Sequence, residues 1–230
     1  MYVAEIFRSL QGECNMQGAP TIFVRFAGCN LACVDCDTAY SRDQQGAAVL
    51  SASAVLDRVR QLDNHPRFVC LTGGEPLIQP AAELQDLIAR LAQITGLQKI
   101  IIETNGSLLI RSFLEGLQKE RLSFAVDYKL PGSQMSQSMV RQNFPILRSC
   151  DTLKFLCHDT EDMQAALDVL RRLTNCHECS PIVYFHFTGG TPSPVTAEFV
   201  LAHCSQFAQR FDIRYGIQLH KLLWGGERGR

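Results

Sequence analysis

Apolar residues along the chain fall into short runs and longer periodic stretches. The short runs are rich in β-branched and aromatic residues, and several are apolar at consecutive positions, which is typical of strands buried on both faces. We expect strands at residues 21–26, 68–72, 99–103, 122–127, 152–157, 182–187 and 213–219. Stretches with a helical period predict helices at residues 51–62, 80–94, 159–173 and 196–207. Thr160 and Thr196, with acidic residues in the following turn, are the expected N-caps of the last two helices.

The alternation of strands and helices implies βαβ units and an α/β fold with a mostly parallel sheet, either open or rolled into a partial barrel. No internal repeat, low-complexity segment or linker divides the chain, so we expect a single domain over residues 1–230. In sheets of this kind, ligands bind at the carboxyl ends of the strands. Functional residues should therefore lie just after the strands.

Composition narrows the class of protein. Hydrophobic residues make up 46% of the 230 positions and charged residues 20%, as in an ordinary globular protein. A net charge of −1 argues against a broad cationic surface for nucleic acids. The N-terminus lacks a basic leader followed by an apolar run, and the longest apolar runs are far shorter than the ~20 residues that cross a bilayer. We expect a cytoplasmic protein that binds neither nucleic acid nor membrane.

The ten cysteines are the unusual feature of the composition. Disulfide frameworks belong mainly to small secreted chains, so we expect thiols or metal ligands. Cys29, Cys33 and Cys36 follow the 21–26 strand with the spacing C-x3-C-x2-C. Three thiolates in one loop can bind three irons of a 4Fe–4S cluster, and no fourth cysteine or histidine follows at ligand spacing, so one iron would stay open. A structural zinc site or an electron-transfer cluster would need four ligands, and the plain alternative is a loop of structural thiols.

This three-cysteine loop resembles that of the radical S-adenosylmethionine superfamily. The resemblance implies a partial TIM-like barrel of mostly parallel strands, and an open iron that binds the amino and carboxylate groups of S-adenosylmethionine. Reductive cleavage of the cofactor would give a radical that abstracts a hydrogen from the substrate. The segment LTGGEP at residues 71–76 is similar to the one that receives the methionyl ammonium, with Gly74 allowing close approach and Glu75 complementing the charge. On its own, this segment would be a plain strand-to-helix turn.

Further motifs narrow the superfamily. They are FRSLQGE at residues 7–13, GAP at 18–20, FVRFAGC at 23–29, DT at 37–38, IETNG at 102–106, DYKLPGS at 127–133 and QLHKLLWG at 218–225. Together they resemble the 7-carboxy-7-deazaguanine synthase family. That family would imply a homodimeric lyase, reduced by a flavodoxin or ferredoxin, that contracts 6-carboxy-5,6,7,8-tetrahydropterin to 7-carboxy-7-deazaguanine with loss of ammonia, on the route to queuosine. The alternative is an activating enzyme of a glycyl-radical enzyme, which uses the same cluster.

The resemblance implies two sets of ligand contacts. The substrate side consists of Leu10, Gln11, Gly12, Arg25 and Thr72. The cofactor side consists of Asp35, Cys36, Asp37, Gly74, Glu75, Asp127, Tyr128 and Lys129. Arg25 would bind the substrate carboxylate through its planar guanidinium, although an arginine at a strand end is more often an ion-pair partner. A Gln-Gly pair such as residues 11–12 is likewise a common turn.

Thr38 is implied as a ligand of Mg²⁺ that bridges to the substrate. One neutral hydroxyl binds Mg²⁺ weakly, so the site should fill only when the substrate carboxylate is present. The ion could then orient the reacting molecule as a Lewis acid. The alternative is an Asp-Thr turn or a helix cap after the cysteine loop.

The sequence departs from the family pattern in two places. Asp-Tyr-Lys at residues 127–129 stands where many relatives have Ser-Pro-Lys, so the lysine carries over more securely than its two neighbours. Cys14 stands where a glycine often follows the glutamate, so its backbone needs an angle that cysteine can adopt, and the local loop is expected to differ from that of the family.

The other cysteines have ordinary explanations. We expect Cys70 and Cys157 in strands and Cys204 in a helix to be small buried apolar residues. Cys176 and Cys179 form a C-x2-C pair without a second half at ligand spacing, which favours a turn over a zinc or redox site. The single tryptophan, Trp224, is expected to pack the tail over the barrel mouth or a partner subunit, and the role of His220 is left open.

Overall fold

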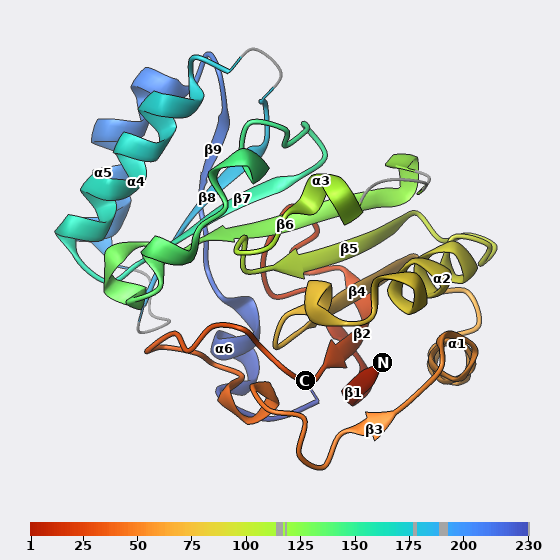
Figure 1. The fold of residues 1–230 in the computed structure, drawn as a ribbon. Helices are drawn as coiled ribbons and strands as arrows, with labels where there is room; N and C mark the ends of the chain where they lie inside the picture. The colour runs from red at the N-terminus through yellow and green to blue at the C-terminus, as the bar shows by residue number, and fades with distance from the viewer. Residues whose placement is uncertain (114–116, 118, 177–178, 189–192, 230) are drawn as a thin grey trace.

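The computed structural model describes residues 1–113, 117, 119–176, 179–188 and 193–229. Within these residues the strands form one sheet in the order β3-β1-β2-β4-β5-β6-β7-β8-β9 (Figure 1). Their bounds are β1 (Tyr2–Leu10), β2 (Pro20–Phe26), β3 (Ala48–Val49), β4 (Phe68–Gly73), β5 (Lys99–Thr104), β6 (Leu122–Tyr128), β7 (Thr152–Cys157), β8 (Ile182–Phe187) and β9 (Asp212–Tyr215). β1 runs antiparallel to β2 and β3, and every pairing from β2 to β9 is parallel. The end strands β3 and β9 do not pair with each other, so the expected partial barrel of mostly parallel strands is confirmed.

Helices follow most of the strands. Their bounds are α1 (Ala52–Leu62), α2 (Ala81–Leu91), α3 (Ile110–Phe113), α4 (Thr160–Leu173), α5 (Pro194–Cys204) and α6 (Leu219–Trp224). Figure 1 shows α1 and α2 beside the N-terminal strands, and α4 and α5 together beside β7, β8 and β9. Among the described residues, no helix combines the length and the apolar character needed to cross a membrane.

Alternation along the strands separates two faces of the sheet. One face packs against the helices in the main core, which includes Val24 of β2 and Leu71 of β4. The residues in between form a second, smaller cluster on the opposite face, made of Phe7, Cys14, Phe23, Cys70, Ile101 and Ala125. Two positions further on that same face, four strands carry the polar residues Arg25, Thr72, Glu103 and Asp127. The period of two thus places a row of polar groups above an apolar floor.

The helix N-caps differ from the expected ones by a few residues. Asp159, and not Thr160, caps α4, because its side chain accepts a hydrogen bond from the N–H of Asp162 at 2.9 Å. α5 begins after Ser193, so Thr196 lies inside the first turn, where its hydroxyl donates to the Ser193 carbonyl at 2.9 Å. In both cases a polar residue just upstream takes the cap position.

Four helices and strands lie outside the expected set, namely β1, β3, α3 and α6. β1 carries a bulge between Val3 and Glu5, which interrupts the two-residue alternation that would reveal a strand. β3 is only two residues long. The strand expected at residues 213–219 ends at Tyr215, and α6 begins where the Leu219 N–H donates to the Gly12 carbonyl at 3.0 Å. That long-range contact carries the C-terminal segment across to the loop between β1 and β2.

Candidate active site

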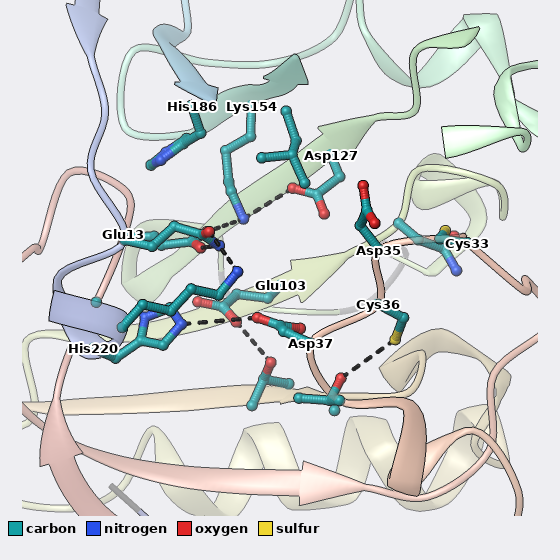
Figure 2. A pocket seen from close by; sticks show the side chains of 18 of the residues that line it. Glu13, Cys33, Asp35, Cys36, Asp37, Glu103, Asp127, Lys154, His186 and His220 are labelled. Carbon is teal, nitrogen blue, oxygen red and sulfur yellow. Dashed lines mark hydrogen bonds and ion pairs between the residues drawn. The ribbon is translucent and has the colours of Figure 1, made fainter. Parts of the chain in front are cut away.

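A cavity of about 950 Å³ lies at the carboxyl ends of β2 and of β4 to β8. Its floor includes Phe7, Phe23 and Ala125 of the smaller apolar cluster. The polar row above the floor, the cysteine loop and the C-terminal segment complete its wall, and Figure 2 shows the charged side chains from these elements converging on it. The cavity thus lies just after the strands, where the sequence analysis expects the functional residues. A volume of this size is at the upper end for small-molecule sites, which leaves room for two ligands.

The three cysteines of the loop after β2 all line the cavity. The loop is fixed at its start, because the Gly28 N–H donates to the Ser41 carbonyl at 2.8 Å and the Cys29 N–H donates to the Arg42 carbonyl at 2.9 Å. The amide of Asn105 at the end of β5 donates to the sulfur of Cys29 at 3.7 Å. Burial raises the pKa of the Cys29 and Cys33 thiols, so as free groups they hold their protons at neutral pH.

The donor set fits a 4Fe–4S cluster. In the described part of the chain, no three His, Cys, Asp or Glu side chains converge on one point as the ligands of a single ion do. A cubane cluster instead takes one thiolate on each of three irons, and three thiols spaced around one side of a cavity match that requirement. The fourth iron would face the cavity.

Gly74 lies against the start of the cysteine loop. Its N–H donates to the Phe26 carbonyl at 3.1 Å, and a Cβ at this position would lie 1.9 Å from the Gly28 carbonyl oxygen. Only glycine therefore allows the turn after β4 to pass this close to the loop. Gly74 lines the cavity, as expected for a cofactor contact.

Glu75 is directed away from the cavity. Its carboxylate is fully buried and accepts hydrogen bonds from the Leu77 N–H (3.0 Å), the Thr104 hydroxyl (2.7 Å) and the Asn105 N–H (2.7 Å). Burial outweighs these bonds and raises the pKa of Glu75 to about 7. Glu75 joins the turn after β4 to the end of β5, and it is not among the residues that line the cavity.

The five residues expected on the substrate side all line the cavity. The Gln11 amide donates to one oxygen of Glu103 at 3.1 Å, and the Thr72 hydroxyl donates to the other at 2.6 Å. Arg25 donates through Nε to Glu5 at 2.7 Å, and Glu5 also accepts from the Tyr40 hydroxyl at 2.6 Å. The ion-pair alternative for Arg25 is thus present, but within the described residues the two terminal guanidinium nitrogens have no hydrogen-bond partner.

Thr38 precedes the short 3₁₀ helix Ala39–Ser41 without capping it through its side chain. The turn or cap alternative is thus present through the backbone, since the Thr38 carbonyl accepts from the Ser41 N–H at 2.9 Å, but the hydroxyl takes no part in it. The nearest polar partner of the hydroxyl is the sulfur of Cys36 at 3.8 Å, and the residue lines the cavity. This oxygen stays available to a ligand.

Two of the cofactor-side aspartates lie near histidines. Asp35 lies close to Nε2 of His158, whose Nδ1 lies 2.8 Å from the buried Asp162. His220 of α6 lies 3.8 Å from Asp37. Asp35, Cys36, Asp37, Gly74, Asp127, Tyr128 and Lys129 line the cavity.

The departure at residues 127–129 has a defined geometry. Lys129 pairs with Asp127 at 2.7 Å, whereas the ring of Tyr128 packs on Phe144 with centroids 4.7 Å apart. Tyr128 therefore contributes to the core as well as to the cavity wall. Asp127 and Lys129 present their charged groups to the cavity.

Cys14 keeps a backbone conformation that suits glycine, in place of the altered loop that the sequence indicated. Its φ is +56°, in the left-handed region that favours glycine, and its side chain is 1% exposed. Burial raises the pKa of this thiol to about 12. The turn aims the neighbouring Glu13 into the cavity.

Cys70, Cys157 and Cys204 are buried, as expected. The Cys179 N–H donates to the Cys176 carbonyl at 3.2 Å, which confirms a turn there, although residues 177–178 between them lie outside the described residues.

The sequence analysis did not assign several titratable residues to the site. They are Glu13, Glu103, Lys154, His158 and His186, joined by Gln218 before α6. Lys154 interrupts the apolar run of β7, and the register pairs it with Asp127 on β6. Two residues paired across parallel strands point to the same face, so this register is the signal that would have found it.

The sequence profile of the Radical SAM superfamily matches residues 23–129, which contain the cysteine loop and both segments after β4 and β5. With the open barrel and the three thiols at its mouth, the chain is a radical S-adenosylmethionine protein. Similarity extends over the full length to 7-carboxy-7-deazaguanine synthases. That of Clostridium acetobutylicum is 32% identical over 226 residues, covering 96% of this chain and 95% of the relative. The chain belongs to the 7-carboxy-7-deazaguanine synthase family.

Other relatives agree. The 7-carboxy-7-deazaguanine synthase of Leptospira interrogans is 33% identical over 248 residues, covering 99% of this chain and 97% of the relative. That of Thermoplasma acidophilum is 35% identical over 226 residues and 98% of both chains. The crystal structure of QueE from Escherichia coli has the same fold, with a TM-score of 0.68 at 21% identity over 94% of both chains.

Proposed function

We propose that this chain is a radical S-adenosylmethionine lyase that contracts 6-carboxy-5,6,7,8-tetrahydropterin to 7-carboxy-7-deazaguanine and releases ammonia, in the biosynthesis of queuosine and related 7-deazapurines. The observation that carries this proposal is one cavity with three thiols on one side and a ring of carboxylate, amide and guanidinium groups on the other. When bound, the reduced cluster and S-adenosylmethionine supply the radical that takes a hydrogen from the substrate.

The protein groups suit a flat, polar substrate with one carboxylate. Glu13 and Glu103 are acceptors for the N–H groups of a pterin edge, and Gln11 and Thr72 hold Glu103 in place at 3.1 and 2.6 Å. The free terminal nitrogens of Arg25 form a fork for the substrate carboxylate. Leu10 and Gly12 complete this wall.

The cofactor occupies the other half of the cavity in this proposal. The loop at residues 35–37 faces its adenine end, Gly74 its methionyl end, and Asp127 and Lys129 its ribose or carboxylate. Glu75 acts on the cofactor indirectly, because its carboxylate holds the end of β5 against the turn that contains Gly74. Tyr128 contributes by packing on Phe144.

We further propose that Thr38 binds Mg²⁺ together with the substrate carboxylate. A hydroxyl that caps no helix, beside the cysteine loop and in the same cavity as Arg25, supports this site. A flavodoxin or ferredoxin as reductant, a homodimer and a cytoplasmic location are the remaining parts of the proposal.

A product assay tests the function. The reconstituted, reduced chain is incubated with the carboxytetrahydropterin, S-adenosylmethionine and Mg²⁺, and the product is identified by its deazapurine absorbance and mass. We expect the deazapurine from the wild type and none from Cys33→Ala, which lacks one cluster ligand. Cleavage of S-adenosylmethionine without loss of the pterin would instead favour a different substrate, such as the protein backbone used by activating enzymes.

A further inference from the structure

We propose that Lys154 is a positioning residue that keeps a substrate-side carboxylate, Glu13, and a cofactor-side carboxylate, Asp127, ionised at the same time. Each ligand then finds a charged acceptor whether or not the other is bound. The inference rests on the proposed function for the identity of the two ligands.

The sheet register sets the first contact. Asp127 and Lys154 are partners on β6 and β7, and Nζ of Lys154 lies 2.9 Å from Oδ1 of Asp127. The same Nζ forms an ion pair with Oε2 of Glu13, which reaches it from the loop between β1 and β2 (Figure 2). The side chains of Lys154 and Glu13 are only 13% and 12% exposed. One largely buried ammonium is therefore shared by two carboxylates from distant parts of the chain.

The other groups around Lys154 do not replace it. Lys129 pairs with the far oxygen of Asp127 at 2.7 Å, and Glu13 accepts its other hydrogen bond from the neutral Gln218 amide at 2.6 Å. His186 is buried with neither ring nitrogen hydrogen-bonded within the described residues, and burial lowers its pKa to about 4, so it is neutral at pH 7. The other titratable neighbours are His220 and Asp37, which lie near Glu13, the third acid Glu103, and the thiols of Cys14 and Cys33.

Sharing one cation keeps both acids charged despite their burial. Burial opposes ionisation of Glu13, but the positive charge of Lys154 holds its pKa well below the ordinary value. Burial likewise opposes ionisation of Asp127, and Lys129 and Lys154 hold its pKa below the ordinary value. Without Lys154, two carboxylates that contact the same point would repel each other, and one would keep a proton.

If the two acids shared one proton, binding of either ligand would weaken binding of the other. In Lys154→Met, a cofactor that donates hydrogen bonds to Asp127 favours its ionised form and moves the proton to Glu13. Glu13 then becomes a poorer acceptor for the pterin, and by linkage the pterin weakens cofactor binding to the same extent. In the wild type neither acid holds a proton, so this antagonism is absent.

Binding measurements test the antagonism. The dissociation constant of S-adenosylmethionine is measured by equilibrium dialysis of the reconstituted chain, with and without the carboxytetrahydropterin, near pH 6.5 and near pH 8.5. In Lys154→Met we expect the pterin to weaken S-adenosylmethionine binding about tenfold more than in the wild type at the lower pH, and less at the higher pH. Lys154→Arg, which keeps the charge, and Lys99→Met, a matched substitution outside the cavity, should behave as the wild type. Equal coupling in Lys154→Met and wild type at both pH values would overturn the proposal.

Carboxyl ¹³C NMR of the protein without ligands gives an independent readout. The Glu13 and Asp127 signals are assigned from Glu13→Gln and Asp127→Asn. In Lys154→Met, the pKa of one of the two carboxyl groups should lie above its ordinary value. In the double variant Glu13→Gln/Lys154→Met, which lacks the like-charge pair, the pKa of Asp127 should not lie above its ordinary value. Two low pKa values in Lys154→Met would overturn the inference. A wild type that does not bind the pterin would overturn the proposed function, while the NMR titration would still decide the role of Lys154.

Discussion

A residue at this site can bind a ligand only through polar atoms that do not already form hydrogen bonds within the protein. Glu75 and Thr38 show the two outcomes. The carboxylate of Glu75 accepts three hydrogen bonds from its own chain and is fully buried, so the motif LTGGEP uses its acid to build the turn. The hydroxyl of Thr38, in contrast, caps no helix and lies on the cavity wall.

Thr38→Ala tests the magnesium site. Loss of the hydroxyl should leave cluster assembly intact, because Thr38 is not a cluster ligand, and should weaken the apparent affinity for Mg²⁺ about tenfold or more. The measurement is the initial rate as a function of Mg²⁺ concentration, with iron content as the control. Thr38→Ser, which restores an oxygen, should regain most of the response. An identical magnesium curve for Thr38→Ala and the wild type would rule out this ligand.

At the scale of elements, α6 is held against the loop between β1 and β2. The Leu219 N–H donates to the Gly12 carbonyl at 3.0 Å, and Gln17 donates to the carbonyls of Gly12 (2.8 Å) and Ile217 (2.6 Å). Gly12 is needed at this contact, because a Cβ there would lie 2.1 Å from Nδ1 of His220. The position of α6 thus depends on the absence of a Cβ at Gly12.

Gly12→Ala should push His220 and α6 away from the cavity. We expect a higher KM for the pterin and little change in cluster content, because Gly12 is not one of the cysteines that would bind the cluster. The control is the double variant Gly12→Ala/His220→Ala, in which the ring that would clash is gone. If the two substitutions act through this contact, their effects on KM should be less than additive, and strict additivity would contradict the close approach.

Most of the strands and helices could be predicted from the sequence, whereas only part of the candidate site could. Buried parallel strands give apolar runs, so β2 and β4 to β8 could be predicted within one or two residues. The cysteine loop and the substrate-side residues could be identified from sequence motifs. Lys154 could not be found that way, since a lysine within an apolar strand has no local signal and its partner Asp127 lies on the neighbouring strand. His220 and Gln218 reach the cavity through contacts with a loop some two hundred residues earlier in the chain, as the Gln218–Glu13 hydrogen bond shows.

At the scale of the whole molecule, two buried groups give folding opposite pH dependences. Burial raises the pKa of Glu75 from 4.5 to about 7, so the folded state binds this proton more tightly, and the resulting stability is present at low pH and lost as pH rises to about 7. Burial lowers the pKa of His186 from 6.5 to about 4, so its contribution is present above 6.5 and lost as pH falls towards 4. Each effect is worth about 3 kcal/mol, and they largely cancel between these limits.

Single variants should expose the two opposing slopes. As pH falls from about 6.5 to about 4.5, the free energy of unfolding of His186→Phe should rise relative to the wild type, because the variant loses the group that resists protonation. Glu75→Gln should show the reverse, because it cannot take up the stabilising proton. Urea unfolding at several pH values measures both. Parallel curves for wild type and either variant would show that the group in question has the same pKa in the folded and unfolded states.

We expect the three cysteines at the mouth of the open barrel to hold a 4Fe–4S cluster whose fourth iron takes S-adenosylmethionine. The direct test is electron paramagnetic resonance of the reduced, reconstituted chain, before and after addition of S-adenosylmethionine. We expect about four irons per chain and a cluster spectrum that changes when the cofactor is added. A spectrum that stays the same with and without S-adenosylmethionine would contradict it.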